Sequence, residues 1–177
     1  MSGELLTVRD FFRYAVTSFT HANLHFGHGA STAIDEAAFL VLEALSLPID
    51  DINPWLDARL TEREQRRLSL LIEERVRTRK PAAYLVNKAY IQGVPFFIDE
   101  RVIVPRSYIG ELLATEPTFL PAPSDIRSVL DLCTGSGCLA ILAAFSYPDA
   151  EIHAADLSRD ALEVAKRNVA DHGLNDR

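Results

Sequence analysis

A glycine turn and two aspartates are the residues of this chain whose types and spacing could do chemistry. In the stretch VLDLCTGSGCLAILAAF, residues 129–145, the turn Gly135-Ser136-Gly137 follows a strand-forming run and opens a helix-forming one. Glycines at such a turn let the backbone pass close to a ligand that a Cβ atom would push away. Asp156 follows at the end of the next expected strand, where a carboxylate accepts hydrogen bonds from both hydroxyls of a ribose. The pattern predicts a nucleotide site but does not choose between cofactors.

Asp131, four residues before Gly135, bears on that choice. Its anion would repel the pyrophosphate of NAD, whereas S-adenosylmethionine presents a cationic sulfonium and an ammonium group that a nearby carboxylate favours. The letters GSGCLA also satisfy the weak dinucleotide pattern G-x-G-x-x-A, so a fragment of an NAD-binding oxidoreductase stays an alternative. A purely structural glycine turn is the other alternative. The acid itself favours the methyl donor.

The elements that must position this turn are expected to alternate between strand and helix. We expect strands at 127–132 and 151–155, with a helix at 136–146 between them. Ser158 should cap a last helix, which His172-Gly173 ends. A βαβα run of this kind is the opening half of a doubly wound parallel sheet, so the fold class is α/β.

Three amphipathic helices are expected upstream, and they should form a small bundle. The first and third begin with a capping box, formed by Thr7 with Asp10 and by Thr61 with Glu64. The second should begin at Ser31 or Thr32, with Asp35 or Glu36 at the capping-box return position. Its expected buried residues are Ala38, Phe39, Leu42 and Leu45.

A strand-like segment follows the helices. Residues 89–104, AYIQGVPFFIDERVIV, alternate and cluster β-branched and aromatic residues, which predicts a β-hairpin. Pro105 suits the first turn of a following helix. Pro117, Pro121 and Pro123 fall within seven positions and indicate a stiff, extended linker.

Composition limits the function classes. The formal net charge of −7 argues against wholesale attachment to nucleic acid or to an acidic membrane. The start of the chain has no signal-peptide pattern and the longest apolar run is too short to cross a bilayer, so we expect a cytoplasmic protein with no membrane partner. The two cysteines, Cys133 and Cys138, are expected to be free thiols.

The motifs resemble a known family. VLDLCTGSG followed by AADLS is similar to the motif pair of class I S-adenosylmethionine-dependent methyltransferases. Residues 79–112, RKPAAYLVNKAYIQGVPFFIDERVIVPRSYIGEL, resemble the segment before the methyltransferase domain in the protein-(glutamine-N(5)) methyltransferases of the HemK/Prm family. FTHANLHFGHG and PRS resemble its PrmB branch. The resemblance implies S-adenosyl-L-methionine as cofactor and a glutamine of the large-subunit ribosomal protein L-three as acceptor, with release factors as the alternative substrate.

The resemblance also implies a domain plan and a set of site residues. Residues 1–88 would be a helical substrate-recognition domain, 89–123 a β-hairpin, helix and Pro-rich linker, and 124–177 the first part of an incomplete Rossmann-like methyltransferase domain. The implied cofactor-binding residues are Asp131, Cys133, Thr134, Gly135, Ser136, Gly137, Asp156 and Leu157. Cys133 stands where many class I enzymes have a glycine. Pro105 and Arg106 would lie near the active-site mouth on the substrate side, although Arg106 could equally be a structural ion-pair partner.

The family's catalytic motif, Asn-Pro-Pro-Tyr, does not occur in these 177 residues. In the family, the Asn side chain and the carbonyl after it hold the acceptor amide. We therefore expect the motif beyond Arg177, no catalytic residue within this chain, and no turnover by the chain alone. A non-catalytic interaction module is the remaining alternative.

Two further clusters have more than one interpretation. His21, His25 and His28 are spaced like metal ligands, but the adjacent glycines favour loop capping and packing, and we expect no metal. The segment from Arg59 to Lys80 holds eight cations and four glutamates. It is either a solvated helix face or a contact with ribosomal RNA or an assembling ribosomal particle.

Overall fold

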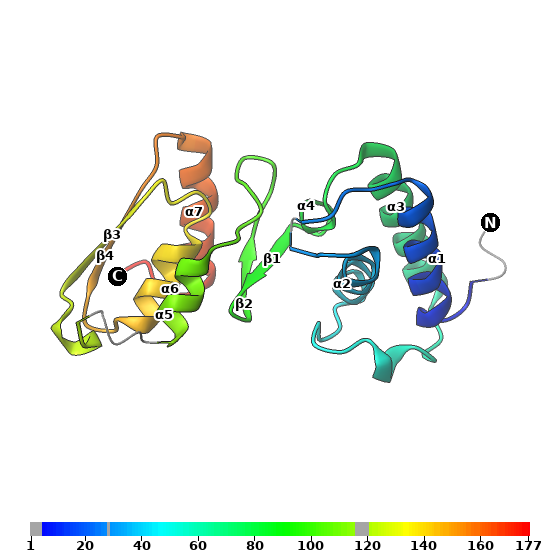
Figure 1. Ribbon diagram of the computed structural model, residues 1–177, viewed down its shortest axis with the longest axis horizontal. Helices are drawn as coiled ribbons and strands as arrows, with labels where there is room; N and C mark the ends of the chain where they lie inside the picture. Colours follow the sequence, from blue (N-terminus) through cyan, green and yellow to red (C-terminus); the bar gives the residue numbers. More distant parts are fainter. Residues whose placement is uncertain (1–4, 28, 116–120) are drawn as a thin grey trace. The chain divides into compact units, whose positions relative to one another are not determined.

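The computed structural model describes residues 5–27, 29–115 and 121–177, and the chain divides into two compact units, Met1–Val86 and Asn87–Arg177. The N-terminal unit is helical (Figure 1). Its elements are α1 (Val8–His21), α2 (Ala33–Leu45), a 3₁₀ turn (Asn53–Trp55), α3 (Glu62–Thr78) and α4 (Ala82–Leu85). In the part of the chain that is described, no helix combines the length and the apolarity needed to cross a membrane.

Local capping starts the helices of this unit. The capping boxes Thr7 with Asp10 and Thr61 with Glu64 are both formed, which confirms those two N-termini. At the first, the hydrogen bond from the Thr7 hydroxyl and those from two backbone N–H groups lower the pKa of Asp10. Thr32 caps α2 by accepting a hydrogen bond from the Asp35 amide. A bundle of α1, α2 and α3 encloses a common apolar core, to which α1 contributes Val8, Phe11, Ala15 and Phe19.

The buried face of α2 differs from the expected one. Ala38, Phe39 and Leu45 are only half-buried, whereas the helix buries the neighbouring stripe Ala37, Leu40, Val41 and Ala44 together with Leu42. The helix is apolar on most of its circumference, so the sequence period does not select one face. Packing against α1 and α3 decides it.

A buried ion pair joins α2 to α3. The Arg75 guanidinium donates to Glu36 Oε2 from Nη2 at 2.9 Å and from Nε at 3.2 Å, and both side chains are at most 5% exposed. Glu36 Oε1 accepts the Ala82 amide at 2.9 Å, and Arg75 Nη2 also donates to the His25 carbonyl. The interpretation of segment 59–80 as one solvated or particle-binding face is therefore wrong for Arg75, which is internal.

The C-terminal unit begins with an antiparallel hairpin. Its elements are β1 (Lys88–Ile91), β2 (Val94–Phe97), α5 (Tyr108–Thr115), a 3₁₀ turn (Pro123–Asp125), β3 (Ser128–Leu132), α6 (Cys138–Ser146), β4 (Glu151–Ala155) and α7 (Arg159–Asp171). Gln92 and Gly93 make the hairpin turn with φ of 51° and 75°, as a two-residue type I′ turn requires. The expected hairpin is thus confirmed over residues 88–97, where it packs on α7 and α6, whereas residues 98–104, also expected in it, form no strand.

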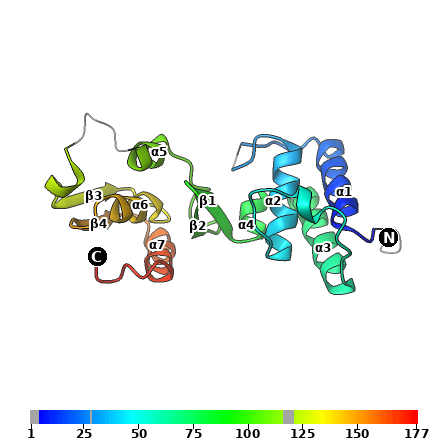
Figure 2. The same ribbon diagram turned by 90° about the horizontal axis from the view of Figure 1, so that it is seen from below.

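The helix after the hairpin starts later than expected. Pro105 does not occupy its first turn, because α5 begins at Tyr108, where the Ser107 hydroxyl accepts the Ile109 amide. Gly110 lets α5 lie close to its neighbours, since a Cβ there would be 2.8 Å from Ile91 Cγ2 and 3.2 Å from a Leu142 methyl. Figure 2 shows α5 beside α6. Of the expected proline linker, Pro117 lies outside the described residues.

The second half of this unit has the expected βαβα order. β3 pairs with β4 in parallel, with Ser128 opposite Glu151 and Leu132 opposite Ala155. Ser158 caps α7 by accepting the Ala161 amide, as predicted, and the helix ends one residue before His172. The chain therefore has the α/β fold class of a helical bundle and a β-hairpin followed by a Rossmann-like βαβα segment.

Candidate functional site

The site is built around the turn between β3 and α6. Cys133, Gly135 and Gly137 have φ of 60°, 56° and 79°, so every second residue of the turn is left-handed. The Gly137 amide donates to the Thr134 carbonyl at 2.9 Å, which closes the turn before the helix begins. The Thr134 amide donates to the Ala155 carbonyl at 3.0 Å, so the turn is tied to the end of β4.

Asp131 is held by the turn that it precedes. The Thr134 hydroxyl donates to Asp131 Oδ2 at 2.6 Å, and the Thr134 side chain is buried. Asp131 itself is half-buried, and its Oδ1 has no hydrogen-bond partner among the residues described. Oδ2 thus fixes the turn through Thr134, and Oδ1 is left to accept hydrogen bonds from a ligand.

Asp156, the residue after β4, is hydrogen-bonded to the glycine turn. Its Oδ2 accepts the Gly135 amide and its Oδ1 accepts the Ser158 amide, each at 2.9 Å. These two amides, that of Ser158 first, lower the pKa of Asp156, so the carboxylate is ionised at neutral pH. Each carboxylate oxygen has a further lone pair, which can accept a hydroxyl of a sugar.

The two glycines of the turn serve different purposes. A Cβ on Gly137 would be 3.2 Å from the Ala165 Cβ and 3.3 Å from its Cα, so this glycine allows α6 to begin tightly against α7. A Cβ on Gly135 would meet no atom within 4 Å. Gly135 therefore borders open space beside both Asp156 and the turn, where a ligand can approach the backbone.

Cys133 is the exposed residue at the first left-handed position. A glycine adopts that conformation without steric cost, whereas a side chain with a Cβ does not, which gives a physical reason for the glycine that many class I enzymes have there. Cys138 is buried at the start of α6, and burial raises the pKa of its thiol. Neither cysteine is in a disulfide.

The other expected cofactor residues surround the same turn. Ser136 is buried within it, and Leu157 directly follows Asp156 with its side chain fully exposed. Asp131, Thr134, Gly135 and Asp156 are thus joined by hydrogen bonds, and Cys133, Ser136, Gly137 and Leu157 lie beside them in sequence. Their role in binding a cofactor is still a prediction.

Asn168 of α7 is a site residue that the sequence analysis missed. Its side chain is completely buried, and its Oδ1 accepts the Phe97 amide at 2.7 Å. Its Nδ2 donates to the Phe97 carbonyl at 2.9 Å and to the Ser136 carbonyl at 2.8 Å. One amide group therefore connects β2 to the glycine turn. An asparagine in line with Ala161 and Ala165 on an apolar helix face was the available signal.

Two further contacts hold the hairpin on α7. The Arg167 guanidinium lies 3.5 Å from the centre of the Phe97 ring, and His172 Nε2 is 2.9 Å from the Pro95 carbonyl oxygen. The hairpin is thereby fixed to the helix that also supports the turn. Asn168 lies between these two contacts in sequence.

The remaining expected residues lie outside this network. Pro105 is buried and Arg106 is exposed in the segment between β2 and α5, and their substrate-side role stays a prediction. His21 ends α1 and His25 lies in the following loop, both exposed, whereas His28 is outside the described residues. Over the described ranges, no group of three His, Cys, Asp or Glu side chains could hold a metal ion.

Comparison with known proteins agrees with this architecture. Residues 113–177 match the family model of the methyltransferase small domain. The chain is 54% identical to a protein from Bradyrhizobium diazoefficiens over 99% of its own length and 57% of the relative's. A protein from Burkholderia pseudomallei is 53% identical over 97% and 56%, and one from Neisseria meningitidis serogroup B is 50% identical over 98% and 58%.

All three relatives are named ribosomal protein uL3 glutamine methyltransferase. The chain spans a little over half of their length. These matches and the βαβα fold agree with the expected family. Residues 113–177 are similar to the methyltransferase small domain, and nearly the whole chain is similar to these glutamine methyltransferases.

Proposed function

We propose that this chain forms the donor half of an enzyme that transfers a methyl group from S-adenosylmethionine to the side-chain amide of a glutamine in ribosomal protein uL3. One observation carries the donor assignment: Gly135 has open space where a Cβ would lie, beside an ionised Asp156 that accepts its amide. In nucleotide-binding folds of this kind, a glycine lets the ligand approach the backbone closely, and a carboxylate after the next strand accepts the ribose hydroxyls.

The residues present fit this cofactor. Asp156 would accept the ribose hydroxyls through the lone pairs that its two amide donors leave unused. Asp131 would favour the cationic part of the molecule through its unpartnered Oδ1. Leu157, exposed next to Asp156, suits contact with an adenine ring. When bound, the cofactor supplies an electrophilic methyl group on a positively charged sulfur.

The acceptor assignment rests on the names of the relatives and on the resemblance of residues 79–112 to the glutamine methyltransferases. An amide nitrogen is a poor nucleophile, so its methylation depends on orientation and electrostatics more than on a strong base. No Asn-Pro-Pro-Tyr sequence occurs in this chain to hold that amide. We therefore expect the chain to bind the donor without turning over.

Calorimetric titration with S-adenosylhomocysteine and, separately, with NAD tests the donor site. We expect the first to bind and the second not to, and Asp156→Asn to weaken binding about tenfold through loss of charged hydrogen bonds. Asp149→Asn, in the exposed loop before β4, is the matched control and should bind as the wild type does. NAD binding, or equal binding by the Asp156 variant, would contradict the proposal.

A methyl-transfer assay with purified uL3 and radiolabelled S-adenosylmethionine tests the acceptor half. The expected result for the 177-residue chain is no transfer above background. Transfer to a uL3 glutamine by this chain would confirm the substrate and show that residues within it hold the acceptor amide.

A second expectation concerns the partner surface. Contact of segment 59–80 with an assembling ribosomal particle is supported by the exposure of Arg63, Arg66 and Arg67 on α3. Arg75 does not contribute, because it is paired with Glu36 in the interior. A ribosomal-protein substrate would also fit the cytoplasmic location that the sequence led us to expect.

A further inference from the structure

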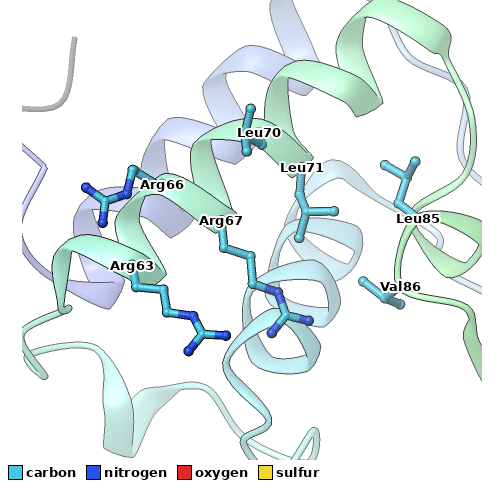
Figure 3. A pocket seen from close by; sticks show the side chains of 7 residues that line it. All are labelled: Arg63, Arg66, Arg67, Leu70, Leu71, Leu85 and Val86. Atoms are coloured by element: carbon cyan, nitrogen blue, oxygen red, sulfur yellow. The ribbon is translucent and has the colours of Figure 1, made fainter.

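The N-terminal unit carries a groove that the proposed methyl transfer does not use. It lies along α3 and the end of α4 and has a volume of about 550 Å³. Its lining residues are Arg63, Arg66, Arg67, Leu70, Leu71, Leu85 and Val86. Figure 3 shows Arg63 and Arg67 extending to the same side of α3, with Leu71, Leu85 and Val86 farther along the groove.

The groove combines cationic and aliphatic surface. Arg66 pairs with Glu62 at 3.3 Å, and both side chains are more than 60% exposed, so this pair contributes little and is easily exchanged. Within the described ranges, the side chains of Arg63 and Arg67 have no hydrogen-bond or ion-pair partner. Leu70 is 66% exposed, although leucine is a residue that folding normally buries. The surface therefore offers guanidinium groups to an anion and an uncovered leucine to an apolar side chain.

We propose that the groove binds a segment of a partner protein that carries carboxylate side chains next to aliphatic ones. The guanidinium groups match carboxylates in charge and can bind them in a bidentate manner. The four aliphatic side chains offer the apolar floor on which leucine-like side chains of the segment are buried.

RNA fits the same surface less well. Single-stranded RNA binds through aromatic side chains on which bases stack, and none of the seven lining residues is aromatic. A polyanion that extended past the groove would also meet a chain of net charge −7. The apolar floor and the limited extent of the cationic surface therefore favour a peptide.

Fluorescence anisotropy with the 177-residue chain tests this inference. The probe is a fluorescein-labelled dodecapeptide of repeated Glu-Leu-Leu-Glu, and its controls replace every glutamate by glutamine or every leucine by serine. We expect the probe to bind and each control peptide to bind about tenfold more weakly, because each lacks one half of the complementarity. A labelled dodecauridylate serves as the RNA probe.

Variants locate the binding site. The double substitution R63E/R67E should weaken peptide binding about tenfold or more by replacing attraction with repulsion. R59E/R77E changes the net charge equally with residues outside the groove and should leave binding within about twofold. L70S, at an exposed position, should weaken the peptide and not the RNA.

Unchanged binding by R63E/R67E, or equal loss in R59E/R77E, would overturn the assignment. Tighter binding of the dodecauridylate, with displacement of the peptide, would assign the surface to RNA instead. Circular dichroism of each variant checks that α1 to α3 still form.

Discussion

Replacing Asn168 should loosen the connection between the hairpin and the glycine turn. In Asn168→Ala, the Phe97 amide, the Phe97 carbonyl and the Ser136 carbonyl lose partners that lie 2.7 to 2.9 Å away. A buried hydrogen bond contributes about 1 kcal/mol net, so three of them give a loss of about 3 kcal/mol in the free energy of unfolding of the C-terminal unit. That is a large share of the stability of a small domain.

Two probes separate this loss from a general destabilisation. Trp55, the single tryptophan, lies in the N-terminal unit, so its fluorescence follows urea unfolding of that unit. Hydrogen exchange of the Phe97 amide reports directly on the bond that Asn168 Oδ1 accepts. We expect faster exchange at Phe97 and in 134–137, with an unchanged Trp55 transition.

A matched control lies two residues away on the same helix. Lys166 is 72% exposed and pairs only with Glu163 in the contacts described, so Lys166→Ala should change stability by less than about 0.5 kcal/mol. Asn168→Asp keeps an acceptor for the Phe97 amide, but it replaces Nδ2 by a carboxylate oxygen that faces the Phe97 and Ser136 carbonyls. At neutral pH it should therefore lower the free energy of unfolding at least as much as Asn168→Ala does. A loss below about 1 kcal/mol in Asn168→Ala, or equal loss of protection in α1 to α3, would refute the reasoning.

Three further changes follow from the structure. Cys133→Gly should raise the free energy of unfolding by about 0.5–1 kcal/mol in urea titrations, because φ there is 60°, whereas Cys133→Ala should give no gain. Glu36→Gln should cost about 3–5 kcal/mol by leaving the buried Arg75 charge unpaired, while Glu62→Gln, at an exposed pair, should be near neutral. The folded-state pKa of Asp156 is lowered, so its stabilisation is complete above the ordinary value near 3.9 and is lost as pH falls through the folded value. In an acid titration followed by circular dichroism, Asp156→Asn should lack the part of the stability loss that protonation of Asp156 causes in the wild type.

Local rules account for what the sequence could predict. Capping boxes depend on residues three positions apart, so Thr7 with Asp10 and Thr61 with Glu64 are visible in the letters. The βαβα order follows from strand-forming runs that alternate with helical ones, and the position of the left-handed turn follows from its glycines. These features require no knowledge of distant contacts.

Contacts between distant residues account for what the sequence could not predict. Arg75 is in line with the buried Leu68 and Ile72 on α3, but its partner Glu36 is 39 residues away in sequence, so the letters do not show which carboxylate neutralises it. Asn168 is 71 residues from Phe97, and its role depends on how the hairpin packs on α7. The buried face of α2 likewise depends on its neighbours, because the helix is apolar on most sides.

The structure also changes how the two aspartates should be understood. From the sequence, Asp131 and Asp156 are expected to bind a cofactor; in the structure, each is already hydrogen-bonded within the protein, Asp131 to Thr134 and Asp156 to the Gly135 amide. The turn is therefore fixed before any cofactor arrives, and little ordering remains to oppose binding. Because these contacts involve only the turn and the residues beside it, we expect donor binding not to depend on residues that hold an acceptor amide. On this proposal the chain binds the donor without turnover, so the two properties have to be measured separately.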